Sequence, residues 1–295
     1  MESKNVYFNI ADLILEVNLP NFLEEKKILP TFMPFTSETA SNVDMRIKVQ
    51  LDKELVKEEG SKLLTDVSYI LEYRFRLEET ENYYYITIIE AERNNPFCMR
   101  SSKDFRDNEI FARRDNIDDY FRYKWIIMAA FGQFVLSKGG LLLHSSTVVK
   151  DNVGYAFLGV SGTGKSTHSR LWLNHITGAE LLNDDNPVVR IKKDGTVWIY
   201  GSPWSGKTDC YKNKSVPLKA MVRLEQAPEN NISTLSGKKA LLALLPSGSG
   251  LAYNDTLFQS MVDHMSRIIE KVQVGYLKCL PDAEAAEICY KHFNS

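Results

Sequence analysis

The N-terminal part of the chain alternates between hydrophobic and polar positions in several short runs and shows little helical periodicity. Alternation is partial over Val6–Val17 and clearer over Met45–Val49, and a period of two is typical of strands with one buried face. Two further runs, Tyr69–Arg76 and Tyr83–Ala91, are separated by a short acidic segment, which predicts a hairpin. We therefore expect residues 1–115 to form an antiparallel β-rich region.

A strongly apolar segment follows, and its pattern predicts a helix. Residues 117–137 are hydrophobic nearly all round in the middle, which is typical of a helix that is buried on all sides. Asp115 or Asn116 can cap its N-terminus, and Gly139 can end it. We expect this helix to be buried between the β-rich region and the rest of a second domain, residues 116–295.

From Leu141 onward, strand-like and helix-like segments alternate, which is typical of an α/β (α+β) fold. The predicted strands, of which the first four form two hairpins, are Leu141–Val149, Gly154–Leu158, Pro187–Lys192, Thr196–Tyr200, Ala220–Glu225 and Gln273–Leu280. The predicted helices are Thr167–Thr177, Asn254–Val272 and Asp282–Phe293. The sequence therefore predicts a second domain with mixed sheets after the smaller β-rich region.

One loop in this second domain carries the strongest chemical signal. Gly159–Ser166 matches the phosphate-binding pattern G-x-x-x-x-G-K-[ST], and it lies between a predicted strand and a predicted helix. Glycines let backbone amides turn toward phosphate oxygens, and the helix N-terminus adds a partial positive charge. We expect Lys165 to reach the terminal phosphates of ATP and the Ser166 hydroxyl to ligate Mg²⁺. The residues predicted to bind the nucleotide are Gly159, Ser161, Gly162, Thr163, Gly164, Lys165, Ser166 and Thr167.

Two adjacent acidic residues, Asp184 and Asp185, follow a short apolar segment downstream of the loop. A phosphoryl-transfer site needs a carboxylate for the metal ion and usually another that orients or deprotonates the attacking oxygen. Either aspartate can take either role, and a solvated turn before Pro187 is the alternative. His144 lies in the predicted strand beside the loop strand, where it is either a core residue or a contact for phosphate, metal or acceptor.

The segment Gly201–Thr208 matches the same phosphate-loop pattern. A strand is predicted before it, but the residues after it, with Pro217 close behind, make a poor helix. We therefore do not expect an independent nucleotide site here. Ser205, Lys207 and Lys212 remain candidates to approach the transferred phosphate or the acceptor from the opposite side of the site.

Composition narrows the classes of protein. A hydrophobic fraction of 44% and a charged fraction of 25% are typical of folded domains. The net charge of −2 predicts no recruitment of nucleic acid or of an anionic membrane. The chain opens on no apolar signal segment, and its longest apolar run, Trp125–Leu136, is too short to cross a bilayer. We expect a cytoplasmic protein whose four cysteines, which lack zinc-site spacing, are free thiols.

Three short motifs in a fixed order resemble the phosphoenolpyruvate carboxykinase and HPr kinase/phosphorylase superfamily. They are His144-Ser145-Ser146, the loop Gly159–Thr167 and the pair Asp184-Asp185, and the resemblance covers residues 141–225. It implies a two-sheet α/β nucleotide domain that differs in topology from doubly wound phosphate-loop proteins. At Thr167 the chain is closer to the carboxykinase loop than to that of HPr kinases.

The resemblance also implies roles for individual residues. Lys165 and the loop amides would hold the phosphates of ATP, while Ser166 and one aspartate of the pair would hold Mg²⁺. The other aspartate would be a candidate base, and His144 falls on the active-site histidine of the family. Independently of the resemblance, Lys207 is a candidate to offset developing charge at the transferred phosphoryl group.

The resulting hypothesis is an HPr-kinase-like enzyme that transfers the γ-phosphoryl group of ATP to a hydroxyl group. The acceptor would be a Ser or Thr of a peptide or protein, or a small metabolite. One alternative is an ATP-binding module without transferase activity that acts on a protein partner through the β-rich region. Another is a small decarboxylating carboxykinase. The sequence leaves the acceptor, the two aspartate roles and the oligomeric state open.

Overall fold

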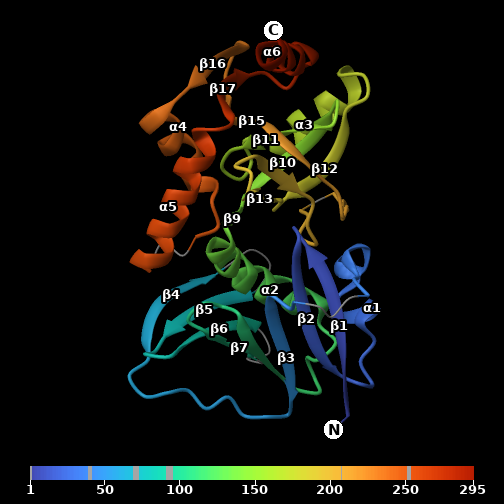
Figure 1. Cartoon of the computed structure of the whole chain (residues 1–295), viewed down its shortest axis with the longest axis vertical. Helices are drawn as coiled ribbons and strands as arrows, with labels where there is room; N and C mark the ends of the chain where they lie inside the picture. Colours follow the sequence, from blue (N-terminus) through green and yellow to red (C-terminus); the bar gives the residue numbers. More distant parts are fainter. Residues whose placement is uncertain (1, 39–41, 69–72, 91–95, 207, 251–253) are drawn as a thin grey trace. The chain divides into compact units, whose positions relative to one another are not determined.

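The computed structural model describes residues 2–38, 42–68, 73–90, 96–206, 208–250 and 254–295 (Figure 1). Its tertiary contacts divide the chain into two compact units, Met1–Ser137 with Leu251–Asp255 and Lys138–Gly250 with Thr256–Ser295. The fold is mixed α/β with two mixed sheets, as the sequence predicts. The division follows the apolar helix of the middle segment, whereas the sequence placed it before that helix, between residues 115 and 116.

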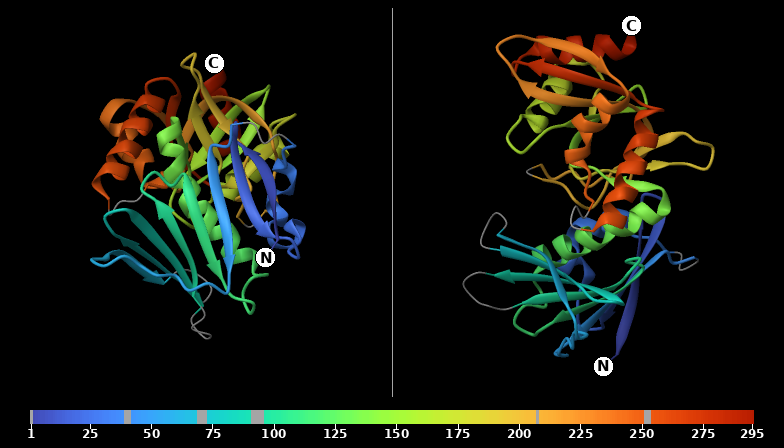
Figure 2. Two further views of the ribbon diagram at one scale, coloured as in Figure 1. Left: turned by 60° about the horizontal axis from the view of Figure 1, so that its bottom comes forward. Right: turned by 90° about the vertical axis from the view of Figure 1, so that its left-hand side faces the viewer.

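The N-terminal unit is built on one eight-stranded sheet of order β1-β2-β3-β8-β7-β6-β5-β4. Its strands are β1 (Ser3–Ile10), β2 (Leu13–Pro20), β3 (Met45–Leu51), β4 (Lys62–Ser68), β5 (Tyr73–Glu79), β6 (Tyr83–Glu90), β7 (Phe97–Ser102) and β8 (Asp107–Ala112). Hairpin β1–β2 continues through β3 into β8 as one curved sheet (Figure 2). Because β3 pairs in parallel with both β2 and β8, the sheet is mixed and not an antiparallel meander throughout.

The segment Val6–Val17, whose partial alternation is typical of strands, belongs to a hairpin. Ala11 and Asp12 form its turn with φ angles of 55° and 60°, the left-handed conformation that two-residue hairpin turns require. The predicted hairpin across the acidic segment is confirmed as the antiparallel pair β5–β6. The first residues of its predicted first strand, 69–72, lie outside the described part of the chain.

Helix α2 (Tyr120–Phe134) packs on β6 and β7 of this sheet. The predicted cap at Asp115 or Asn116 is wrong. The cap is Asp119, whose carboxylate accepts hydrogen bonds from the amides of Phe121 and Arg122. Asn116 is instead part of the preceding turn. The other helical segments of this region are α1 (Glu25–Ile28), η1 (Pro30–Phe35) and η2 (Val135–Lys138).

The C-terminal unit contains a nine-stranded sheet and the remaining helices. Its strands are β9 (Gly140–Leu142), β10 (Ser145–Lys150), β11 (Val153–Leu158), β12 (Glu180–Asp185), β13 (Val188–Ile191), β14 (Val197–Tyr200), β15 (Ser215–Gln226), β16 (Asn231–Leu235) and β17 (Gln273–Cys279). The helices are α3 (Lys165–His175), α4 (Gly237–Leu244), η3 (Leu245–Ser247), α5 (Asp255–Ile269) and α6 (Ala283–Asn294). The predicted helices over 254–272 and 282–293 are thereby confirmed.

Strand β15 joins the two parts of the nine-stranded sheet. Its first residues pair with β14, which continues through β13 to β9. Its later residues pair in parallel with β11 on one side and β17 on the other. Helices α3 and α6 pack together beside the sheet (Figure 1). A buried cluster that includes Trp172, Phe157, Val222 and Phe293 joins them to it.

The predicted strand Leu141–Val149 is two strands, which corrects the placement of His144. Leu141 and Leu142 belong to β9, which pairs with β13. Ser145 begins β10, which pairs with β11 and β12. His144 lies between the two strands, and its amide donates to the carbonyl of Ser247. The hairpin β10–β11 itself is confirmed, with Asp151 and Asn152 in the left-handed conformation at its turn.

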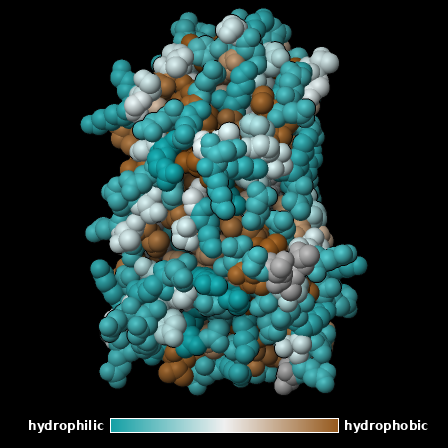
Figure 3. All heavy atoms as spheres, viewed as in Figure 1, coloured by the Kyte–Doolittle hydropathy of each residue, from teal (hydrophilic) through white to brown (hydrophobic). Residues whose placement is uncertain are grey.

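The surface is mixed in character. On the face shown in Figure 3, hydrophilic side chains predominate and hydrophobic ones appear in small groups between them. No helix within the described residues is long and apolar enough to cross a membrane. All four cysteines are free thiols, and Cys210 and Cys289 are buried.

Candidate functional site

The loop Gly159–Gly164 connects the end of β11 to the start of α3, in the order that the sequence predicts. Gly162 and Gly164 have φ angles of 83° and 102°, a conformation that costs a residue with a side chain about 1–2 kcal/mol. Thr163 stabilises the turn within the loop, since its backbone amide and its hydroxyl both donate to the carbonyl of Val160. The glycines therefore give the loop a turn that other residues would adopt only with strain.

Helix α3 begins directly at Lys165 with no side-chain cap. The first intrahelical hydrogen bond runs from the amide of His168 to the carbonyl of Gly164. The amides of Lys165, Ser166 and Thr167 therefore have no acceptor among the described residues, as expected for the first turn of a helix. Together with the helix dipole, these amides provide a site for an anion.

Strand β10 connects the loop to the aspartate pair. Ser145 lies opposite Leu158, the residue just before the loop, on one side and opposite Asp185 on the other. Ser146 similarly lies between Phe157 and Asp184. Neighbouring strands are about 4.8 Å apart, so the end of β11 and the aspartate pair are about 10 Å apart. That spacing suits a phosphate chain held between them.

Asp184 and Asp185 have different surroundings. Asp184 is only 4% exposed, and its Oδ2 atom is buried with no hydrogen-bond partner among the described residues. Asp185 is half-buried and paired at both oxygens, because Oδ1 lies 3.1 Å from Nε2 of His144 and Oδ2 accepts from the side-chain amide of Asn186 at 2.6 Å. The structure thus brings His144 into contact with Asp185 and leaves an oxygen of Asp184 available.

The charge of Lys165 is coupled to this pair. Its ammonium group donates to the carbonyl of Gly159 at 3.0 Å. Burial lowers the pKa of Lys165 from its ordinary value, and the negative charges of Asp185 and Asp184 oppose that decrease, while the positive charge of Arg223 adds to it. The ammonium group therefore lies within electrostatic reach of both carboxylates and of a second cation.

Arg223 is a residue of the site that the sequence did not reveal. It lies on β15 directly opposite Leu158, and its Nη1 atom is buried without a partner among the described residues. The strand Ala220–Glu225 was predicted, but only the parallel pairing of β11 with β15 places this arginine beside the loop. Lys165 and Arg223 repel each other, so a bound anion would stabilise both.

The second match to the phosphate-loop pattern is a different structure. No helix follows it in the described residues up to β15, and its residues lie against the aspartate pair. The side-chain amide of Asn183 donates to the carbonyls of Ser202 and Trp204, and the amide of Gly206 donates to the carbonyl of Asp184. The segment therefore holds the end of β12 in place.

Three residues in or after the second segment were predicted to approach the transferred phosphate or the acceptor. Ser205 donates from its hydroxyl to the carbonyl of Thr208 at 2.5 Å. Lys212 is occupied by the carbonyl of Leu181 and by Glu180. Lys207, predicted to offset charge on the transferred phosphoryl group, lies outside the described residues.

The donor set fits a magnesium ion held jointly with a ligand. No group of three or more His, Cys, Asp or Glu side chains able to hold a metal ion occurs among the described residues. Mg²⁺ usually takes only one or two protein carboxylates and completes its shell with phosphate oxygens and water. The unpartnered Oδ2 of Asp184 is a suitable ligand atom, because a buried carboxylate oxygen without a partner is costly. Ser166, at the first turn of α3, supplies a hydroxyl.

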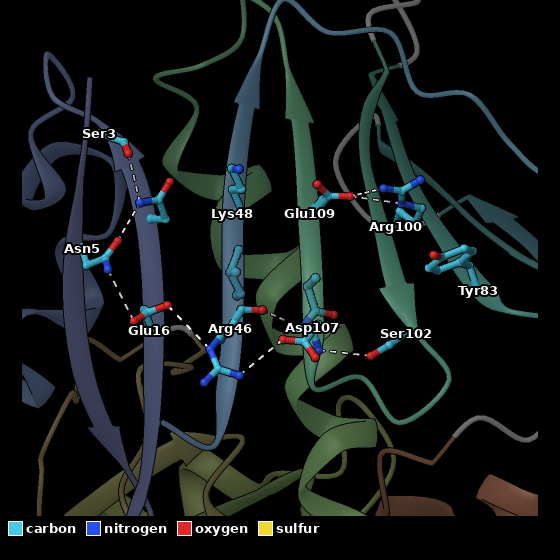
Figure 4. Close-up of a pocket in the computed structure, with 13 residues that line it drawn as sticks. Ser3, Asn5, Glu16, Arg46, Lys48, Tyr83, Arg100, Ser102, Asp107 and Glu109 are labelled. Carbon is cyan, nitrogen blue, oxygen red and sulfur yellow. Dashed lines mark hydrogen bonds and ion pairs between the residues drawn. The ribbon is translucent and has the colours of Figure 1, made fainter. Parts of the chain in front are cut away.

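Two surface hollows could hold a ligand. One lies beside the loop, and the other lies in the N-terminal unit. One, of about 400 Å³, is lined by loop residues and by Arg223 and Gln226 of β15. The other, of about 670 Å³, lies on the sheet of the N-terminal unit (Figure 4). In the second hollow most charges are paired with one another, as between Arg46 and both Glu16 and Asp107 and between Arg100 and Glu109. Lys48, which also lines this hollow, has no ion pair among the described residues.

Comparisons with known proteins add little to these observations. No protein-family model matches the chain, and no curated protein matches it. Among solved structures, the HPr(Ser) kinase/phosphatase from Coxiella burnetii is similar over 51% of this chain and 91% of that chain, with 14% sequence identity and a TM-score of 0.29. At that TM-score the likeness supports no conclusion about activity, so the site is interpreted from its own residues.

Proposed function

We propose that the protein binds ATP with Mg²⁺ at Gly159–Thr167 and transfers its γ-phosphoryl group to a hydroxyl acceptor. The observation that carries this proposal is the register of β10, which places the loop and the aspartate pair on either side of one strand. The same end of the sheet also carries two cationic side chains, three first-turn amides and a buried carboxylate oxygen without a partner among the described residues.

The two aspartates would take the roles of metal ligand and general base, which the sequence alone did not assign to either one. Asp184 would be the metal ligand, because its Oδ2 atom is buried and unpartnered. Asp185 would be the base, because His144 and Asn186 fix the orientation of its carboxylate. A base needs such positioning within hydrogen-bond reach of the proton that it takes.

In the proposed reaction, the loop amides and Lys165 hold the phosphates in line with the acceptor oxygen. Asp185 takes the proton of the acceptor hydroxyl as the new P–O bond forms, and the bond between the β–γ bridging oxygen and the γ-phosphorus breaks to release ADP. Bound Mg²⁺ would neutralise charge on the β- and γ-phosphates. Lys165 and Arg223 would stabilise the charge that develops on the phosphoryl oxygens.

The test is a transfer assay with ATP labelled in the γ-phosphate and with Mg²⁺, run against a library of Ser- and Thr-containing peptides, free serine and polyols. We expect label to move to a hydroxyl acceptor with the wild-type protein and not with Asp185→Asn, which keeps the shape of the side chain and loses its basicity. Lys238→Ala, at an exposed position on α4 away from the loop, is the control.

Two outcomes would contradict the proposal. If Asp185→Asn transferred label at the wild-type rate, Asp185 would not be the base. If ATP bound tightly but no hydroxyl in the library accepted label, the protein would be better described as an ATP-binding module. Exchange of label with oxaloacetate would instead indicate a carboxykinase.

A further inference from the structure

A second cavity adjoins the phosphate loop on the side of helix α3. Its volume is about 350 Å³, within the range of roughly 300–1,000 Å³ that is usual for small-molecule sites. Thr163 and Gly164 of the loop form part of its wall. Most of the rest of the wall is apolar and comes from α3, from the end of β15 and from the residues after β17, namely Leu171, Leu224, Ala227, Cys279, Leu280 and Pro281.

A buried histidine, His168, is among the residues that line this cavity. His168 is 2% exposed, and its ring packs edge-on against Phe157. Its Nε2 atom accepts a hydrogen bond from the indole N–H of Trp172 at 3.1 Å. An indole nitrogen is only ever a donor, so Nε2 carries no proton.

The remaining ring nitrogen of His168 must then be a donor. Burial lowers the pKa of His168 to about 3, so the ring is neutral and carries its single proton on Nδ1. This Nδ1–H group is buried and has no acceptor among the described residues. A buried donor without an acceptor is costly, and here it belongs to a residue that lines the cavity.

The cavity also lacks charge. None of the described residues that line it is charged, and burial raises the pKa of Cys279, which keeps its thiol neutral. Gln226 lines both this cavity and the hollow at the loop, and its side-chain amide donates to the carbonyl of Gly162 at 3.2 Å. An apolar, uncharged ligand group with a hydrogen-bond acceptor, attached to phosphates in the loop, fits these walls.

We propose that this cavity binds the purine base of the nucleoside triphosphate, with the Nδ1–H of His168 donating to a ring nitrogen of the base. The inference rests on the proposed function, because it requires the phosphates of the same nucleotide to occupy the loop. A flat heteroaromatic base has the apolar faces that Leu171, Leu224 and Pro281 can contact, and it has ring nitrogens that accept hydrogen bonds.

The first test uses the wild-type protein, so that folding of a variant does not enter. Affinities for ATP and for its 1-deaza, 3-deaza and 7-deaza analogues are measured by calorimetry with Mg²⁺. These analogues remove the three ring-nitrogen acceptors of adenine one at a time. We expect one of them to bind about tenfold more weakly than ATP and the other two to bind within about twofold of it. If all three bound like ATP, the hydrogen bond from His168 would not exist.

The second test uses His168→Gln, whose side-chain oxygen can still accept from Trp172 while no donor remains at the place of Nδ1. We expect this variant to bind ATP about tenfold more weakly than the wild type does. It should also bind ATP and the sensitive analogue equally. A variant that still discriminated between these two ligands would overturn the assignment to His168.

The third test separates the base from the phosphates. Inorganic tripolyphosphate with Mg²⁺ should bind the wild type more weakly than ATP by about tenfold or more. Ala227→Phe places a large side chain in the cavity from a half-buried position. This variant should bind ATP only as tightly as the wild type binds tripolyphosphate, and its affinity for tripolyphosphate should be unchanged. An unchanged ratio would overturn the cavity proposal and leave the phosphate site standing. If neither ligand bound the wild type, the proposed function itself would fail, and the base pocket with it.

Discussion

Two segments of this chain match the same eight-position pattern, Gly159–Ser166 and Gly201–Thr208, and they are built for different purposes. In the first, Gly162 and Gly164 adopt positive φ angles, with open space around Gly162, whereas Gly159 has an ordinary φ angle and a Cβ atom there would lie 3.0 Å from Thr163. In the second, glycines have ordinary φ angles and make close contacts: a Cβ atom on Gly201 would lie 2.0 Å from the carbonyl oxygen of Lys212. At the sixth position of the pattern, Gly164 is needed for its positive φ angle, whereas Gly206 is needed because a Cβ atom there would lie 2.8 Å from the carbonyl oxygen of Asp184.

The difference shows that a match to the phosphate-loop pattern indicates a phosphate site only when the flanking strand and helix are also present. The first segment ends on the N-terminus of α3, which presents unpaired amides. The second ends without a helix in the described residues and uses its polar groups to hold Asn183 and Asp184. The first segment is the one that we propose binds phosphates, and the second holds the end of the strand that carries the two aspartates.

The largest expected effect comes from the lysine of the first segment. Lys165→Ala should lower phosphoryl transfer by about 100-fold or more, because it removes a charge aimed at the transferred group. The free energy of unfolding should change by less than about 1 kcal/mol, since within the described residues the ammonium group donates one hydrogen bond, to the carbonyl of Gly159. Rates are measured with labelled ATP and stability by urea denaturation, with Lys238→Ala as control. Unchanged turnover would rule this loop out as the active site.

Glycine substitutions in the second segment should lower the stability of the protein more than a glycine substitution in the first segment does. Gly201→Ala and Gly206→Ala should each lower the free energy of unfolding by about 1–3 kcal/mol, because the new Cβ atoms would meet Lys212 O at 2.0 Å and Asp184 O at 2.8 Å. Gly162→Ala meets open space and should cost only about 1 kcal/mol, from its positive φ angle. Urea denaturation ranks the three variants. Equal costs in both segments would remove the distinction drawn between them.

A substitution of Asp184 gives a third test. Asp184→Asn should weaken the dependence of ATP binding on Mg²⁺ by about tenfold or more, because its Oδ2 atom is the available ligand. Its stability without metal should not decrease, since that oxygen has no partner to lose. Titration calorimetry at several Mg²⁺ concentrations measures the effect, with exposed Asp209→Asn as the matched control. A variant with the wild-type Mg²⁺ dependence would show that the metal is held elsewhere.

The smallest effect is a dependence on pH. Burial lowers the pKa of Lys165 below 10.5 in the folded protein, and phosphates bound beside it would raise that pKa again. ATP affinity should therefore be full below the lowered pKa and should decrease as pH rises from there toward 10.5, with proton uptake on binding in that window. Stability without ligand should rise slightly with pH over the same window, because the unfolded chain binds the additional proton.

Calorimetry in two buffers of different ionisation enthalpy measures the proton uptake. Lys165→Ala should abolish it, and an equal uptake by that variant would assign the proton to another group.

Much of the C-terminal unit could be predicted because its signals are local. The loop, the hairpin β13–β14 with its Gly195 turn and helix α6 with its Asp282 cap each depend on a few neighbouring residues. The N-terminal unit was harder. The turn at Ala11 and Asp12 lacks the usual glycine, so the pattern over Val6–Val17 did not indicate the hairpin there.

The parts of the site that sequence reasoning missed depend on pairing between distant segments. Arg223 joins the site only because β15 lies parallel to β11, and His168 becomes informative only when Trp172 is seen to occupy one of its ring nitrogens. No short pattern records either fact. The break between β9 and β10 was missed for the same reason, since Leu142 and Ser145 pair with different strands.

Strand β10 has one more consequence, for the order in which the protein folds. It joins β11, α3 and β12, all of which come from the single stretch 145–185. Contacts between segments so near in sequence close only short loops and form early. A refolding chain should therefore acquire its anion-binding turn and its carboxylates before β15 arrives with Arg223, and phosphate ligands should already favour the partly folded chain at that stage.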